Sequence, residues 1–179
     1  MGTKEIQKLI GKMKVMSFHT PVCENVKYLL HHWEMDVISI SKSGMMYEYE
    51  VKISRSDFKA DLKKSKQSFY TKENLVKAWT PNYFAYACPK DLIKLEEIPD
   101  YAGLYYCENG EVIEMKKPKR IHDLIHDRNK ILEKICRVNS ERQFLGACRL
   151  TYENEERRKS FNNISSTDAK SEEQSSACL

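Results

Sequence analysis

The stretch that decides the expected fold begins Met35-Asp36-Val37-Ile38-Ser39-Ile40. It continues with Lys42-Ser43-Gly44 and then with Tyr47-Glu48-Tyr49-Glu50-Val51-Lys52-Ile53-Ser54. Apolar and polar residues alternate on both sides of the glycine, which predicts two strands joined by a tight connection. Glu50 and Lys52 point to the same face of their strand, roughly 7 Å apart. Asp36 opens the first strand. The hairpin is therefore expected to bring two acids and an amine together, as the binding of one hard cation requires.

The whole chain has 179 residues, which suits one domain, and 41% of them are hydrophobic, enough for a core. The net charge of +4 is compatible with a polyanionic partner and equally with ordinary solubility. Six scattered cysteines, with no Cys-x-x-Cys pair, no secretory leader and no membrane-spanning run, predict a soluble protein of a reducing cytoplasm.

Two helices are expected before the hairpin. The first covers residues 4–16, and the second begins at Thr20-Pro21 and continues to Trp33, because Val22, Val26 and later apolar residues recur at helical spacing. Glu24 falls in the first turn of this second helix. It serves either as a carboxylate favoured by the helix dipole or as a further metal ligand near Asp36.

After the hairpin, Ser56 can cap a helix that buries Phe58 and Leu62. Its other faces are rich in lysine. Such a face is usually just solvated, but this helix leaves directly from the strand that carries Glu50 and Lys52, so phosphate contacts are also expected. The candidate nucleic-acid-binding residues are Arg55, Lys59, Lys63 and Lys66.

Residues 82–89 are aromatic-rich and lie between prolines, which predicts a strand buried on both faces. Residues 104–106 and 111–115 predict a hairpin across Asn109-Gly110. One long or broken helix is expected from Ile121 to about Leu150. A nuclease-like domain therefore spans residues 1–150, and residues 151–179 are predicted to form a disordered polar tail.

His122 and His126 could share one face of this last helix and ligate a metal, although a solvated helix with alternating charges explains their spacing better.

For the charged residues of the hairpin, ordinary cross-strand pairing of charges at a strand edge is the competing explanation. A charged pair inside an apolar strand is costly unless it is used, however, and this favours a functional site.

The run Tyr49-Glu50-Val51-Lys52-Ile53-Ser54-Arg55-Ser56-Asp57-Phe58, together with Pro81-Asn82-Tyr83-Phe84 and Tyr101-Ala102-Gly103-Leu104, resembles the PD-(D/E)XK (restriction-endonuclease-like) nuclease superfamily. Within it, the likeness is to a branch of small phage and bacterial proteins near the MmcB-like DNA-repair nucleases. It covers roughly Glu24 to Met115. Two features depart from the pattern: Met35 stands where proline often precedes the first acid, and no clear strand is found between the Pro21 helix and Asp36.

The resemblance implies an α/β fold with a mixed central sheet flanked by helices, here with a C-terminal helical extension. It implies a divalent-metal-dependent DNA endonuclease in which Asp36, Glu50 and Lys52 are catalytic. Asp36, Glu50, the Val51 carbonyl and Glu24 would hold Mg²⁺, for which Mn²⁺ substitutes. Lys52 would orient or deprotonate the attacking water, or stabilise developing charge.

The expected partner is DNA, in a bacterial cell or a phage-infected host, with no membrane. A twofold homodimer would suit cleavage of both strands of a duplex, although no residue argues for one. The alternative function is a catalytically silent nucleic-acid-binding or assembly subunit that retains the fold.

Overall fold

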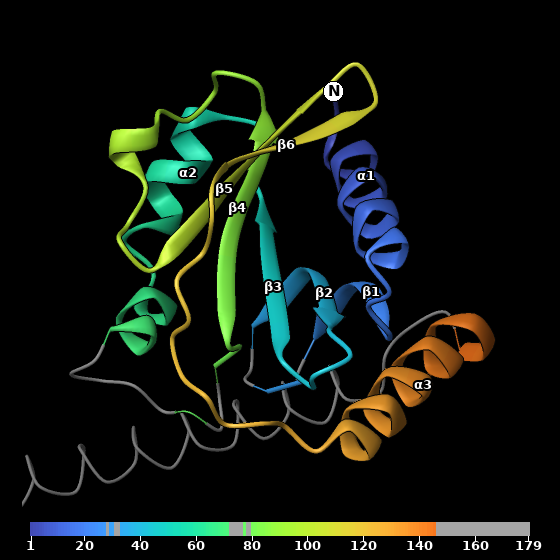
Figure 1. The fold of residues 1–179 in the computed structure, drawn as a ribbon. Coiled ribbons are helices and arrows are strands. Elements are labelled where there is room, and N and C mark those ends of the chain that lie inside the picture. The colour runs from blue at the N-terminus through green and yellow to red at the C-terminus, as the bar shows by residue number, and fades with distance from the viewer. Residues whose placement is uncertain (28, 31–32, 72–76, 78–79, 146–179) are drawn as a thin grey trace, which may run out of the picture. The chain divides into compact units, whose positions relative to one another are not determined.

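The computed structural model describes residues 1–27, 29–30, 33–71, 77 and 80–145. Figure 1 shows a sheet with helices on both sides. The described elements are, in order, α1 (Thr3–Met16), β1 (Val22–Lys27), β2 (Glu34–Ile40), β3 (Met46–Val51), α2 (Arg55–Asp61), the 3₁₀ turn η1 (Ser65–Tyr70), β4 (Tyr83–Pro89), the 3₁₀ turn η3 (Leu95–Glu97), β5 (Ala102–Glu108), β6 (Glu111–Lys116) and α3 (Arg128–Leu145).

The chain divides into two compact units, Met1–Ile135 and Cys136–Leu179, and the first holds the entire described sheet. The predicted disordered tail, residues 151–179, lies outside the described residues. None of the helices described is long and apolar enough to cross a membrane.

The sheet has six strands in the order β1-β2-β3-β4-β5-β6, so each strand lies beside its neighbour in sequence. The pairs β3–β4 and β4–β5 are parallel, and the other three pairs are antiparallel. A parallel pair needs a crossover connection, which α2 and η1 provide between β3 and β4. The prediction of an α/β fold with a mixed sheet and flanking helices is therefore confirmed.

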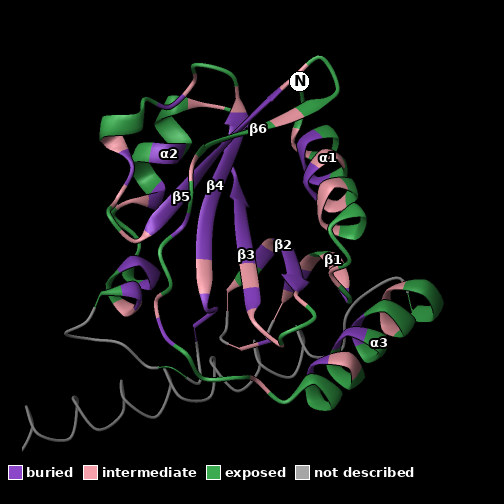
Figure 2. Ribbon diagram, in the orientation of Figure 1, coloured by how far each residue is buried: buried purple, intermediate pink, exposed green. Residues whose placement is uncertain are grey.

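Each face of the sheet packs against a different helix, and strand alternation decides which residues go where. Ile6 and Ile10 of α1 pack on Tyr49, Val51 and their neighbours on one face. Phe58 of α2 packs on Phe84 and Tyr86 on the other face. Figure 2 shows β3 and β4 buried along most of their length between these helices. Polar side chains on β3 therefore lie in a largely dry interior.

The predicted helix from Thr20 to Trp33 is wrong, because Val22–Lys27 is the edge strand β1. It pairs antiparallel with β2, with Glu24 opposite Val37 and Val26 opposite Met35. β-Branched residues such as Val22 and Val26 suit a strand as well as a helix, and pairing with β2 decides the outcome. This strand is the one that the sequence did not reveal before Asp36.

The segment between β6 and α3 also departs from the prediction. α3 begins at Arg128, so the helix expected from Ile121 starts seven residues later than predicted. His122 and His126 lie in the preceding irregular segment, where each Nε2 lies close to the Thr80 carbonyl oxygen, at 2.9 and 3.0 Å. Both side chains therefore fasten this segment to the start of β4, and they do not form a solvated helix face.

Candidate functional site

Asp36 and Glu50 meet at the end of the β2–β3 ladder. The register pairs Val37 with Tyr49, so the next position places Asp36 opposite Glu50. Val51 lies beyond the last register pair, and its backbone N–H donates to Asp36 Oδ2 at 2.8 Å. The Asp36 carboxylate thus lies between the two strands where their ladder ends, as the hairpin pattern predicts.

The Asp36 carboxyl is harder to ionise than an ordinary aspartate. Burial, followed by the negative charge of Glu50, raises its pKa to about 6. Two carboxylates that repel each other in a poorly hydrated place favour either a proton or a cation between them. The pair therefore has the chemistry of a cation site.

Lys52 follows β3 directly, and its ammonium lies beside the Glu50 carboxylate. Its Nζ is 2.9 Å from Glu50 Oε1, 3.3 Å from Asp61 Oδ1 and 3.5 Å from Asp57 Oδ2. Burial lowers the pKa of Lys52, but the Glu50 and Asp61 carboxylates outweigh burial and the net shift is upward. Lys52 is therefore an ammonium at neutral pH.

Lys66 completes the environment of Glu50. Its Nζ lies 2.6 Å from Glu50 Oε2, and the residue is only 4% exposed. The prediction that Lys66 coats a basic helix face is wrong, because α2 ends at Asp61 and η1 turns Lys66 inward. Both oxygens of Glu50 are thus paired with buried ammonium groups.

Asp61 is a buried member of the cluster that the sequence reading missed. Its Oδ2 accepts hydrogen bonds from Gln67 Nε2 at 2.7 Å and from the Tyr86 hydroxyl at 3.0 Å. Burial raises the pKa of this carboxyl, but the positive charges of Lys66, Lys64 and Lys52 lower it further, and the net shift is downward. The sequence does indicate that Asp61 is buried, because it follows Phe58 by three residues and so lies on the apolar face of α2.

Glu48 was also missed. It is fully buried on the same face as Glu50, and its Oε2 accepts a hydrogen bond from the Tyr70 hydroxyl at 3.2 Å. Burial raises its pKa to about 8 even though the charge of Lys66 lowers it, so the carboxyl is largely protonated at neutral pH. The even-numbered alternation Glu48, Glu50, Lys52 was the indication in the sequence.

The remaining predicted residues lie away from this cluster or on its rim. Glu24 is exposed on β1 opposite Val37, whose side chain packs toward α1, and the structure does not bring it to Glu50. Arg55 is held by Glu97 and by the Leu92 carbonyl oxygen, at 3.0 and 2.9 Å from its Nη1. Lys59 and Lys63 are exposed.

The donors at Asp36 fit a small hard cation in part. Across the residues that the structure describes, no three His, Cys, Asp or Glu side chains form a preformed metal cage. Mg²⁺ keeps several waters and often takes only one or two carboxylates. Asp36 can serve as one of them as it stands, whereas Glu50 can do so only after one of its lysine pairs is displaced. The observation behind this fit is that the Asp36 carboxylate lies opposite Glu50, held by the Val51 N–H and with no ion-pair partner among the described residues.

Comparisons with known proteins bear on the fold alone. No family model and no curated protein matches the chain. A solved structure of a protein of unknown function from Silicibacter pomeroyi is similar, with a TM-score of 0.54 and 15% sequence identity, over 76% of this chain and 82% of that one.

Proposed function

We propose that this chain is a divalent-metal-dependent deoxyribonuclease of the PD-(D/E)XK type. The observation that carries the proposal is the Asp36 carboxylate lying opposite Glu50, with the Lys52 ammonium 2.9 Å from Glu50. Asp36, Glu50 and the Val51 carbonyl are the groups that would hold Mg²⁺, and Mn²⁺ would substitute.

Cleavage of a phosphodiester requires an activated water and compensation of the negative charge that develops at phosphorus, and a bound divalent cation supplies both. The chain's own contribution is to hold the carboxylates in place through the Val51 N–H and the two lysines. The raised pKa of Lys52 favours charge stabilisation over a general-base role, since a base must be deprotonated.

The order of elements also supports the proposal. A helix, an Asp-bearing strand, a Glu-x-Lys strand, a second helix and an inner strand follow each other as the resemblance requires. The strand that was missing from the sequence reading is present as β1. Lys59 and Lys63 supply exposed positive charge next to the strand that carries Glu50.

A second candidate is a nucleic-acid-binding subunit that retains this fold without cleaving. The favouring observation is that Glu50 is only 6% exposed and that each of its oxygens is paired with a buried lysine. A cation would have to displace one of these pairs before Glu50 could act as a ligand.

The test is incubation with plasmid, single-stranded and branched DNA in Mg²⁺, Mn²⁺ or EDTA. Asp36→Asn is expected to lower cleavage at least about 100-fold. The same change removes the repulsion with Glu50, so the variant should unfold in urea no earlier than the wild type. Glu111→Gln, at an exposed acid of β6, is the matched control and should cleave normally.

Cleavage by the wild type that persists in EDTA contradicts the proposed metal site. Cleavage by both Asp36→Asn and Lys52→Met at the wild-type rate contradicts the assignment of these residues to the active site. Absence of cleavage on all three substrates, with binding retained, favours the second candidate. Titration calorimetry with Mn²⁺ separates the cases further, because the proposal expects heat of binding from the wild type and none from Asp36→Asn.

A further inference from the structure

Phe18, directly after α1, is placed where a bulky residue is unfavourable. Its φ is 60°, in the left-handed region that normally takes glycine at the end of a helix. Backbone hydrogen bonds from Phe18 N to Val15 O at 2.9 Å and from His19 N to Lys14 O at 3.0 Å hold this turn. The ring is nevertheless 70% exposed, so it gains little from packing.

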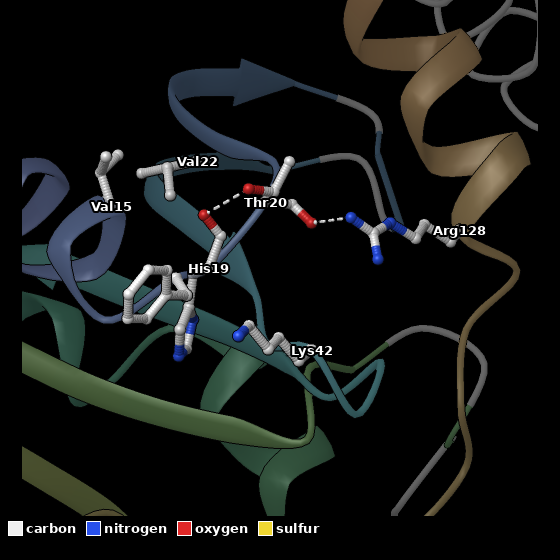
Figure 3. A pocket seen from close by; sticks show the side chains of 7 residues that line it. Val15, His19, Thr20, Val22, Lys42 and Arg128 are labelled. Atoms are coloured by element: carbon white, nitrogen blue, oxygen red, sulfur yellow. Dashed lines mark hydrogen bonds between the residues drawn. The ribbon is translucent and has the colours of Figure 1, made fainter.

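Phe18 lines a cavity of about 470 Å³. Figure 3 shows how His19, Lys42 and Arg128 surround this cavity. Its lining includes Val15, Phe18, His19, Thr20, Lys42 and Arg128. Lys42 Nζ is 4.5 Å from the centre of the Phe18 ring, and Arg128 Nη2 donates to the Thr20 carbonyl at 2.7 Å. The described lining thus contains two cations and no carboxylate, and such a cavity is complementary to an anion that carries a flat apolar group.

His19 adds a neutral polar group to the same cavity. Its Nδ1 lies 2.9 Å from Ser39 Oγ, and its ring is 5.1 Å from that of Tyr47. Burial, followed by the positive charge of Lys14, lowers its pKa to about 4. It therefore offers hydrogen bonding without further charge at neutral pH.

A second hollow of about 290 Å³ lies between α1 and β1, and it shares the lining residues Val15 and Val22 with the first cavity. Lys8 and Lys12 line it, with Glu24 as its one described acid. It extends to Gln7, whose Nε2 donates to Asn25 Oδ1 at 2.8 Å and to the Asp36 carbonyl at 3.4 Å. The two hollows together form a positively charged surface groove that runs from Phe18 along α1 and β1, on the face of the sheet opposite the Asp36 and Glu50 carboxylates.

We propose that this groove binds a single-stranded stretch of DNA, with an unpaired base stacked on Phe18 and its phosphates held by Lys42, Arg128 and Lys12. Sequence-tolerant single-strand binding combines a basic groove with exposed aromatic rings, and both occur here. In a duplex the bases are stacked on one another and paired, so no base is free to stack on the exposed Phe18 ring. The choice of DNA rests on the proposed nuclease function, whereas the stacking site rests on the groove alone.

Fluorescence anisotropy in EDTA tests the site without any cleavage. The probe is a labelled oligothymidylate of about 12 nucleotides, within the site sizes of single-strand binders. Phe18→Leu, which keeps an apolar side chain but no aromatic face, is expected to weaken binding about 5- to 150-fold, and Phe18→Tyr to retain it. Met115→Ala, at an exposed apolar residue of β6 outside the groove, is the control and should bind normally.

A salt titration tests the phosphate contacts. Lys42→Ala should reduce the slope of log affinity against log salt by about 0.7, the value for one lost contact on a single strand. Lys117→Ala, at an exposed lysine after β6, should leave the slope unchanged. Phe18→Gly provides a further check, because glycine relieves the left-handed backbone: this variant should be more stable and bind less.

Normal binding by Phe18→Leu overturns the proposal in favour of an apolar docking surface for another partner. Equal competition by free thymidine monophosphate overturns it in favour of a nucleotide pocket, and duplex binding as tight as that of the single strand overturns it as well. The two proposals fail in different measurements: the loss of binding by Phe18→Leu is measured in EDTA without cleavage, whereas the nuclease proposal fails if the wild type cleaves no substrate in Mg²⁺.

Discussion

Glu48 gives the sharpest prediction, because its protonation is linked to the stability of the fold. The side chain is fully buried, its Oε2 accepts from Tyr70, and its Oε1 meets no hydrogen-bond partner in the described part of the chain. Glu48→Gln replaces the protonated carboxyl by a neutral group of the same shape, whose carbonyl can still accept from Tyr70. The variant therefore isolates the cost of ionisation.

The magnitude follows from the pKa. Glu48 has a pKa of about 8 when folded, against about 4.3 in an unfolded chain, so the folded state binds this proton more tightly. Protonation therefore stabilises the fold at low pH, and the stabilisation is lost as the pH rises from about 4 to about 8. Between about pH 6 and about pH 8 the wild type should lose about 2 kcal/mol through this group.

Urea unfolding of the wild type and Glu48→Gln at several pH values measures the effect. The variant should gain about 2 kcal/mol on the wild type between about pH 6 and about pH 8, while Glu111→Gln, at an exposed acid, stays parallel to the wild type. Subtracting the free energy of unfolding of the wild type from that of the variant at each pH removes the contributions of Asp36 and the histidines, which both proteins share. If the difference in unfolding free energy between Glu48→Gln and the wild type did not change with pH, the assignment of Glu48 as a protonated buried carboxyl would be refuted.

Three further variants test the buried polar groups. Lys66→Met should cost about 3 to 5 kcal/mol in urea unfolding, because it leaves the buried Glu50 and Asp61 carboxylates short of a cation. Lys64→Met removes a partner of the same Asp61 from a half-exposed side chain and should cost less than about 1 kcal/mol; equal losses would contradict the burial argument. Asn82→Ala should cost about 3 kcal/mol in thermal unfolding, since Asn82 accepts from Met46 N at 2.8 Å and donates to the carbonyls of His122 and Leu124 at 3.0 and 2.8 Å. Hydrogen exchange should speed up at Met46 in this variant, and protection equal to the wild type would contradict the role of Asn82.

The hairpin was predictable because its information is local. Alternation assigns Asp36, Glu50 and Lys52 to a face, and a connection with Gly44 at φ 82° fixes the antiparallel pairing. α1, β4 and the β5–β6 hairpin follow from equally local patterns: an apolar helical period, an aromatic run and the Asn109-Gly110 turn. In each of these, neighbouring residues alone decide the backbone.

β1 and Lys66 were not predictable for the opposite reason. Val22–Lys27 becomes a strand because β2 offers it an edge, and this contact leaves no trace in the apolar spacing of the segment itself. Lys66 looked like one more exposed lysine, and its burial depends on η1 turning it toward Glu50, sixteen residues earlier. Tertiary electrostatics, absent from local periodicity, determines both its position and its charge partner.

The charge balance of the cluster explains why a cation is expected at Asp36 rather than elsewhere. Four carboxyl groups gather here, Asp36, Glu48, Glu50 and Asp61, with two buried ammonium groups from Lys52 and Lys66. Glu48 is largely protonated at neutral pH. The two buried ammonium groups pair with Glu50 and Asp61, and the half-exposed Lys64 pairs with Asp61 as well. Asp36 takes part in no ion pair among the described residues, and its carboxylate is fixed by a neutral backbone N–H. Asp36 is therefore the ionisable carboxyl of the cluster that no described lysine pairs with directly, and it is where the PD-(D/E)XK proposal requires the metal.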